Sequence, residues 1–183
     1  MEDIFEINDI EMKSQLDSEY ELEKASLIER QLRLMVKAYP ELEPRREKLR
    51  SLIKAYEDRV WSDLEMITDE KVEESDRAEK IAQCELTFIK KRKDIIRKRL
   101  KAFEMTQQDL GVLLGHPKSY MSELMNGVAN FTLKDLVIIH KVLGIDLNDL
   151  IPTFLQSETR LKVRESIIKL NKPKLEHKKM EFI

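Results

Sequence analysis

The stretch TQQDLGVLLGHPKSYMSELMNG, residues 106–127, decides how the rest of this chain is interpreted. It predicts two short helices joined by a tight turn. Thr106 is a favourable N-cap for the first helix, and Asp109, three residues later, makes an imperfect capping box. Gly115 suits the residue that leaves the first helix. Pro117 is disfavoured within a helix but favoured at a helix start, so the second helix begins there.

Apolar side chains within this stretch recur at helical spacing. They are Leu110, Leu113 and Leu114 in the first helix and Met121, Leu124 and Met125 in the second. Gly111 has no side chain and lets the second helix approach closely, and the dipeptide Asn126-Gly127 favours a turn that ends the motif. All four glycines of the chain lie in or just after the stretch. The pattern favours a DNA-reading helix-turn-helix over the alternative, an ordinary helical hairpin in a bundle.

The composition predicts an all-α protein of one large or two small domains. Of the 183 residues, 37% are charged, aromatic residues and glycines are few, and the mean hydropathy is −0.47. No apolar run reaches membrane-spanning length, and the acidic N-terminus lacks a signal-peptide pattern. The single cysteine, Cys84, excludes an internal disulfide and is expected to be a packed, small apolar side chain. We therefore expect a soluble, cytoplasmic protein.

The net charge of −2 conceals a difference between the two halves of the chain. Residues 1–85 hold 14 Lys and Arg against 24 Asp and Glu, a balance of −10, whereas residues 86–183 hold 19 against 11, a balance of +8. The basic half contains the helix-turn-helix, and neutralisation of phosphates supplies much of the affinity for nucleic acid. The acidic half suits a basic protein partner or is simply a solvated surface.

The N-terminal region, residues 1–61, is predicted to be an arm followed by a helical hairpin. We expect residues 1–17 to be mobile or ordered by a partner. Amphipathic helices over 18–39 and 44–61, with a Pro-containing connection, predict an antiparallel hairpin. We expect its remaining apolar surface to meet the rest of the chain, a second copy or a partner. Its Tyr56 and Trp61 belong either to a partner interface or to the protein's own core.

Residues 62–85 are interpreted as an acidic connector, and the sequence leaves open whether it is a rigid helix or a flexible linker. Thr87 is expected to open a long helix that ends near Phe103. Its basic side chains are a solubilising face or, as we prefer, include phosphate contacts such as Arg97. They are Lys90, Lys91, Arg92, Lys93, Arg97, Lys98, Arg99 and Lys101.

After the motif, Thr132 is expected to cap a helix that runs through Leu143. Its predicted inward side chains are Leu133, Leu136, Ile139 and Val142. A short helix around 147–151 then completes a five-helix domain over residues 86–152. Residues 153–183 are predicted to form a C-terminal helix and a basic tail.

In a helix-turn-helix, residues near the N-terminus of the second helix reach base edges in the major groove. Glu123 accepts from a cytosine amino group or, as an equally weighted alternative, orients neighbouring Lys or Arg side chains. Gln107 is placed to bind a phosphate at a helix N-terminus, and Asn126 contacts the backbone or shapes the turn. The predicted DNA-contacting residues are Thr106, Gln107, Lys118, Ser119, Tyr120, Ser122, Glu123, Asn126 and Arg97. We expect a homodimer that binds an inverted repeat with half-sites about 34 Å apart.

No competing chemistry is visible in the sequence. It has no Gly-rich phosphate loop and no nucleophile with an obvious partner, so no enzyme activity and no cofactor are predicted. The three histidines, His116, His140 and His177, are too scattered for a metal site, and we interpret them as structural or exposed residues.

Two parts of the chain resemble one family. TQQDLGVLLG…KSYMSELMNG, followed by LGIDLNDLI, is similar to the phage-repressor class of helix-turn-helix domains, called XRE-like, which implies a five-helix lambda-repressor-like fold. EYELEKASLIERQLRLMVKAYPELEPRREKLRSLIKAYEDRVW resembles the region that precedes this domain in HigA-type antitoxins, and LIKAYEDRVW is its most distinctive part. The C-terminal IIKLNKPKLEHK also resembles tails of such antitoxins.

The resemblance implies an antitoxin of a bacterial type II toxin–antitoxin system. Such a protein neutralises a small basic RelE-fold toxin that cleaves mRNA and represses its own operon. The acidic connector, residues 62–85, departs from the short linker of many relatives. The alternative is a stand-alone dimeric repressor whose hairpin only dimerises.

Overall fold

The computed structural model describes residues 8–63, 67–153, 157–172 and 174–175, and every regular element within them is helical. The prediction of an all-α fold is therefore confirmed. By its contacts the chain divides into two units, residues 1–151 and 152–183.

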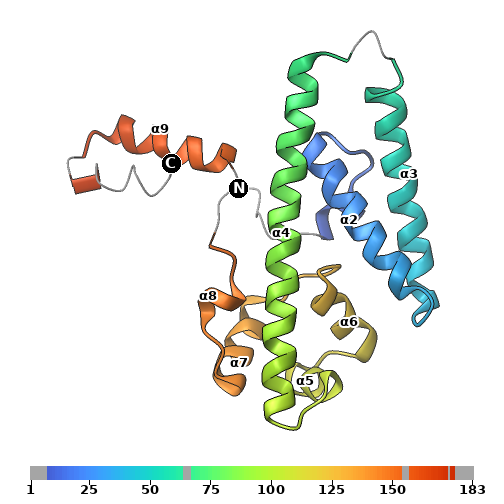
Figure 1. Ribbon diagram of the computed structural model, residues 1–183, viewed down its shortest axis with the longest axis vertical. Coiled ribbons are helices and arrows are strands. Elements are labelled where there is room, and N and C mark those ends of the chain that lie inside the picture. The colour runs from blue at the N-terminus through green and yellow to red at the C-terminus, as the bar shows by residue number, and fades with distance from the viewer. Residues whose placement is uncertain (1–7, 64–66, 154–156, 173, 176–183) are drawn as a thin grey trace. The chain divides into compact units, whose positions relative to one another are not determined.

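One long helix, α4 (Asp69–Ala102), organises the first unit. Figure 1 shows α2 and α3 beside its N-terminal half and α5 to α8 around its C-terminal half. Its 34 residues span about 51 Å at 1.5 Å per residue. The prediction that a helix begins at Thr87 is wrong, because the N-cap is Thr68 and the Thr87 hydroxyl donates to the Gln83 carbonyl inside the helix, at 2.8 Å. Residues 69–85, left open as helix or linker, are helical.

The charges along α4 are strongly polarised. Its first 17 residues, 69–85, hold seven acidic and three basic side chains, and its last 17, residues 86–102, hold one acidic and eight basic side chains. Acidic groups near a helix N-terminus and basic groups near its C-terminus also complement the helix dipole. The two charge excesses seen in the sequence therefore meet within one continuous helix.

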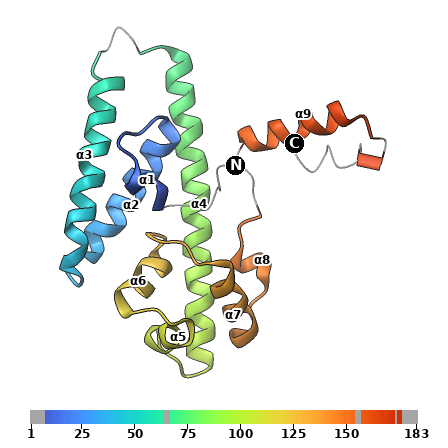
Figure 2. The ribbon, with the colours of Figure 1, turned by 180° about the vertical axis from the view of Figure 1, so that it is seen from behind.

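The N-terminal part of the chain packs on the first half of α4 as α1 (Asn8–Met12), α2 (Glu19–Met35), the 3₁₀ turn η1 (Pro40–Leu42) and α3 (Glu43–Val60). Figure 2 shows α1, α2 and α3 from behind. We call α2, η1 and α3 the hairpin. The hairpin core comprises Ile10, Leu16, Leu22, Ala25, Ile28, Leu32, Met35, Leu42, Leu49, Leu52, Tyr56 and Val128.

Two expectations for this region are corrected. Residues 8–17 are not a mobile arm, because Ile10 and Leu16 are buried in the hairpin core, while residues 1–7 lie outside the described residues. Cys84 is exposed rather than packed. The buried positions Ala78 and Ala82 of this half, and Leu86 at the start of the next half, recur every four residues, and Cys84 lies between two of them on another face.

Tyr56 and Trp61 belong to the protein's own packing. Tyr56 is buried and Trp61 half-buried, and both donate to the same carboxylate oxygen of Glu19, at 2.9 and 3.0 Å. Burial and this hydrogen bond raise the pKa of Tyr56. The polar edges of both aromatic side chains are therefore used inside the hairpin.

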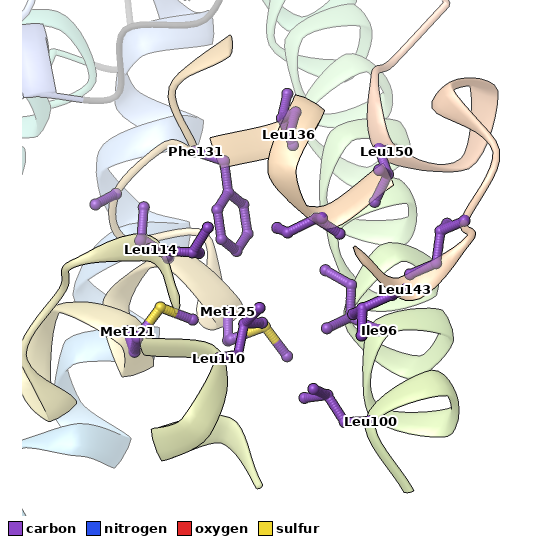
Figure 3. Packing of buried hydrophobic residues seen from close by; sticks show 14 residues of the cluster. Ile96, Leu100, Leu110, Leu114, Met121, Met125, Phe131, Leu136, Leu143 and Leu150 are labelled. Carbon is purple, nitrogen blue, oxygen red and sulfur yellow. The ribbon is translucent and has the colours of Figure 1, made fainter. Parts of the chain in front are cut away.

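The second half of α4 packs with α5 (Gln107–Leu114), α6 (Lys118–Asn126), α7 (Leu133–Leu143) and α8 (Leu147–Leu150). The five-helix domain predicted here is present. Figure 3 shows its buried side chains meeting from all five helices and the loops between them. We call this cluster the motif core; it comprises Ile96, Leu100, Leu110, Leu114, Met121, Leu124, Met125, Ala129, Phe131, Leu136, Ile139, Leu143, Ile145 and Leu150.

Three side chains predicted to point inward are exposed, namely Leu113, Leu133 and Val142. Leu133 is the first residue of α7 and is 71% exposed, since a side chain in the first turn lies beyond the end of the core. In the second unit, α9 spans Ser157–Leu170. Among the described residues, no helix combines the length and apolar character that crossing a membrane requires.

Candidate nucleic-acid interface

The first helix of the motif, α5, begins with a complete capping box. The Thr106 hydroxyl accepts from the Asp109 amide at 3.2 Å, and the Asp109 carboxylate accepts from the Thr106 amide and hydroxyl, each at 2.7 Å. Donation by the Thr106 amide and hydroxyl lowers the pKa of Asp109. The capping box is thus complete although its third helical residue is Asp109 rather than the longer Glu or Gln.

The turn between α5 and α6 depends on two glycines. Gly115 adopts a left-handed φ of +76°, and the next amide, that of His116, donates to the Gly111 carbonyl at 2.8 Å. A Cβ at Gly111 would lie 2.9 Å from both the His116 carbonyl oxygen and Met121 Cγ. The close approach predicted at Gly111 is confirmed, and it brings α5 and α6 together at this point.

The inward face of α6 is fixed by the motif core. Met121, Leu124 and Met125 are at most 1% exposed. The Lys118 side chain is exposed, whereas Ser119 and Tyr120 are half-buried. The Tyr120 ring packs edge-on against His116, with 5.1 Å between ring centroids, and burial raises its pKa.

The turn between α5 and α6 is joined to α7 by a polar contact between His116 and Asp135. His116 Nε2 lies 3.1 Å from the buried carboxylate of Asp135, which also caps α7 by accepting from the Thr132 amide at 3.0 Å. His140 Nδ1 lies 2.7 Å from the Ile145 carbonyl oxygen. These two histidines therefore have structural contacts, and His177 lies outside the described residues. Within the described part of the chain no group of three or more His, Cys, Asp or Glu side chains is arranged to hold a metal ion.

Arg97 and Gln107, two predicted phosphate contacts, lie together. They line one open depression with Lys101, where α4 ends and α5 begins, and its remaining lining residues are Leu100, Glu104 and Met105. Gln107 is the first residue of α5 and is half-buried; Thr106 and Arg97 are exposed. Two cations beside a helix N-terminus suit a phosphate oxygen.

Arg92, by contrast, is not available to a phosphate. Its guanidinium lies 5.1 Å from the Phe131 ring centroid and 5.5 Å from that of Phe88, and the side chain donates to the Leu150 carbonyl at 3.4 Å. Burial lowers the pKa of Arg92 to about 10. The basic run of α4 therefore comprises six exposed side chains, the half-buried Lys93 and the buried Arg92.

The structure places Glu123 in unexpected surroundings. Its side chain is only 8% exposed, and Oε2 accepts from Arg45 Nη1 of α3 at 2.5 Å. Arg45 is also held by both carboxylate oxygens of Glu11, at 2.7 and 2.8 Å, and bonds to Glu11 and Glu123 raise its pKa. The sequence allows two roles for Glu123, contact with a base and orientation of a basic side chain, and this conformation corresponds to the second. The basic side chain is Arg45, which lies 78 residues away in the sequence.

Ser122 and Asn126 lie one turn apart in the C-terminal part of α6, and Asn126 is its last residue. The Asn126 amide nitrogen donates to the Ser122 carbonyl at 2.7 Å, and its oxygen accepts from Lys93 Nζ at 2.6 Å. Asn126 thus shapes the helix end, one of its two predicted uses. Sequence reasoning did not find Arg45 or this role of Lys93, because neither carries a local signal that points to α6.

The comparisons with known proteins support the motif and nothing beyond it. Residues 96–150 match a family model described as helix-turn-helix. No curated protein and no solved structure matches the chain at a significant level. The matched range begins and ends at buried residues of the motif core, Ile96 and Leu150, and includes none of residues 1–95. Residues 96–150 are therefore an XRE-family helix-turn-helix domain, which indicates a DNA-binding transcription regulator.

Proposed function

We propose that this chain is the antitoxin of a type II toxin–antitoxin system, which binds operator DNA as a homodimer and represses its own operon. In this proposal α5 and α6 read the DNA. The acidic half of the chain neutralises a small basic toxin of the RelE fold, which cleaves mRNA.

The observation that carries the proposal is the charge polarity of α4, whose basic half enters the helix-turn-helix domain. The acidic excess does not lie on the N-terminal helices: residues 8–61, which comprise α1 and the hairpin, hold 12 acidic and 11 basic side chains, whereas residues 69–85 hold seven and three. A basic partner is attracted to the second of these segments. We therefore place toxin contact on the exposed carboxylates of α4, such as Glu70, Glu74 and Glu79.

On the DNA side, Lys118 and Ser119 are the proposed base readers, supported by their place at the N-terminus of α6. Arg97 and Gln107 are proposed to hold the phosphate backbone, supported by their shared depression. Thr106, Tyr120, Ser122 and Asn126 are proposed to complete the contact surface. A single domain of this size buries little DNA surface, so we propose a homodimer on an inverted repeat.

The second candidate function is a stand-alone repressor. It is favoured by the way the apolar face of the hairpin is used: its core includes Val128, which follows α6, and α2 packs against α4. A hairpin that is built into its own chain does not need a toxin to cover that face.

Two charge variants of the full chain test the proposal. The first neutralises acidic side chains of α4 (Glu70→Gln, Glu74→Gln and Glu79→Gln), and the matched control neutralises basic ones (Arg97→Gln, Lys98→Gln and Lys101→Gln); all six are exposed. Each is co-expressed with a small basic protein encoded next to it and is assayed for co-purification and promoter binding. The first variant is expected to lose the partner and keep the DNA, and the second to do the reverse. If the wild type and both variants co-purify no protein but the wild type binds the promoter, the antitoxin proposal is refuted and the stand-alone repressor is supported.

A further inference from the structure

The outward face of α6 has a second occupant within this chain. Residues three or four apart share a helix face, so Ser119, Ser122, Glu123 and Asn126 lie together, opposite the buried methionines and Leu124. With the N-terminus of the helix, this is the face that a helix-turn-helix turns toward the base edges. None of these four side chains is fully exposed: three are half-buried and Glu123 is buried.

The hairpin contacts this face at two residues, Glu123 and Asn126, and also packs against the loop that follows α6. Arg45 of α3 pairs with Glu123 at 2.5 Å, and the Asn126 amide nitrogen lies 3.7 Å from the sulfur of Met35, the last residue of α2. Val128, two residues beyond α6, is 0% exposed and belongs to the hairpin core. The contacts come from the end of the hairpin where α2 ends and α3 begins.

The Arg45 contact has the geometry of a latch that joins three elements. Glu11 of α1 holds the guanidinium through two bonds and Glu123 of α6 accepts a third, so all these hydrogen bonds are charge-assisted. Opening the latch within the protein would leave the Glu123 carboxylate without its partner unless water reaches it. The next residue, Arg46, is a natural comparison, because its partners Glu29 and Glu43 lie within the hairpin.

We infer that the hairpin and DNA compete for the same face of α6, with the Glu11–Arg45–Glu123 latch holding the closed state. The inference rests on the proposed DNA reading by α6. DNA is bound by the fraction of molecules in which the hairpin end carrying Met35 and Arg45 has moved away, and the apparent affinity is reduced by that fraction. Any partner that binds the released hairpin end therefore strengthens DNA binding.

The test compares the wild-type chain with Arg45→Gln and Arg46→Gln, each full-length. Each protein is used to enrich duplexes from a random-sequence DNA pool, and the affinity for the enriched duplex is then measured by fluorescence anisotropy at one salt concentration. The Arg45–Glu123 bond exists only in the closed state, whereas the Arg45–Glu11 bonds join α3 to α1 and are lost from both states alike. Arg45→Gln is therefore expected to bind about tenfold more tightly than wild type. Arg46→Gln removes the same charge one residue away and is expected to bind no more tightly.

The outcomes separate the inference from the function on which it rests. Equal or weaker binding by Arg45→Gln, with wild type bound, overturns the competition and leaves DNA reading intact. If only Arg45→Gln enriches a sequence, the result supports the competition and shows that the hairpin keeps the wild-type chain from selecting DNA. Enrichment by none of the three proteins refutes DNA reading, and the competition with it.

A second variant guards against a folding defect in Arg45→Gln. In a Cys84→Ser background, Met35→Cys and Lys93→Cys are joined by a short bis-maleimide linker that contains a reducible disulfide. Lys93 of α4 bonds to Asn126, whose amide nitrogen lies 3.7 Å from the Met35 sulfur, and it is not one of the proposed DNA contacts. The linked protein is expected to lose the enriched duplex and to regain it on reduction. Undiminished binding by the linked protein would show that the hairpin does not need to leave, and would overturn the inference.

Discussion

Gly127, which ends α6, allows the close packing of the helix-turn-helix against α4 to be tested by substitution. Gly115 and Gly127 both follow a helix of the motif in the left-handed conformation, with φ of +76° and +74°. They differ in their surroundings. A Cβ at Gly115 would meet no atom within 4 Å, whereas a Cβ at Gly127 would lie 2.7 Å from Ile89 Cδ1 and 2.9 Å from Ile89 Cγ2.

Alanine at either position therefore incurs the same backbone cost, and only one incurs a steric cost. A left-handed conformation costs a non-glycine residue about 1–2 kcal/mol, part of which is offset because alanine lowers the entropy of the unfolded chain. Displacing Ile89 adds roughly 1–3 kcal/mol. We expect Gly115→Ala to lower the free energy of unfolding by about 1 kcal/mol and Gly127→Ala by about 2–4 kcal/mol.

The assay is urea unfolding of the full chain followed by far-UV circular dichroism, with a double-mutant cycle. Ile89→Val removes Cδ1, the nearest atom, and is expected to recover part of the Gly127→Ala loss while leaving Gly115→Ala unchanged. Equal losses at the two glycines, or no coupling between Gly127→Ala and Ile89→Val, would refute the proposed close seating of α6 on α4.

Three further predictions concern the same domain. Leu124→Ala empties a position that is 0% exposed and is expected to cost about 2–5 kcal/mol in urea unfolding, while the exposed Leu133→Ala costs far less. Asp109→Asn is expected to destabilise the chain at neutral pH. Because the pKa of Asp109 is lowered in the folded state, its contribution is fully present above its ordinary pKa of 3.8 and is lost as the pH falls through the lowered value. Unfolding midpoints of wild type and Asp109→Asn should therefore converge on acidification, and a constant gap would contradict the capping role. Arg97→Ala is expected to weaken binding to all duplexes alike and to reduce the slope of log affinity against log salt by about 1; a change in preferred sequence would contradict a phosphate contact.

The helix-turn-helix was predictable because its signals are local. Thr106 and Thr132 are each followed three residues later by an aspartate, and both capping boxes form. Gly115, Gly127 and Gly144 each end a helix in the left-handed conformation that glycine favours. Such features depend on neighbours within a few residues, which a single sequence displays.

The sequence leaves the first half of α4 open as helix or linker for a physical reason. Its buried side chains are Ala78 and Ala82, and a stripe of alanines carries a weak apolar signal although it permits close packing against another helix. Ala25 of α2, the helix that packs against α4, is likewise buried and is 0% exposed. Thr87 offered a plausible helix start, but its hydroxyl bonds back to a carbonyl one turn earlier and the helix continues.

The covering of α6 was not predictable from the motif. The position of Glu123 suits contact with a base, and nothing near it in the sequence indicates Arg45 as a partner. Long-range ion pairs of this kind depend on how separate elements pack, so only the tertiary structure reveals them. The candidate site therefore changes from a free reading helix to one that shares its outward face with the hairpin.

The most direct test of the account is to select duplexes from a random-sequence pool with the full wild-type chain and to repeat the selection with Lys118→Ala. We predict that the wild type enriches an inverted repeat whose half-sites are about one helical turn apart, and that Lys118→Ala loses the preference at one position of each half-site. Enrichment of no sequence by the wild type and by the Arg45→Gln chain, or an unchanged motif with Lys118→Ala, would contradict the claim that α6 reads DNA.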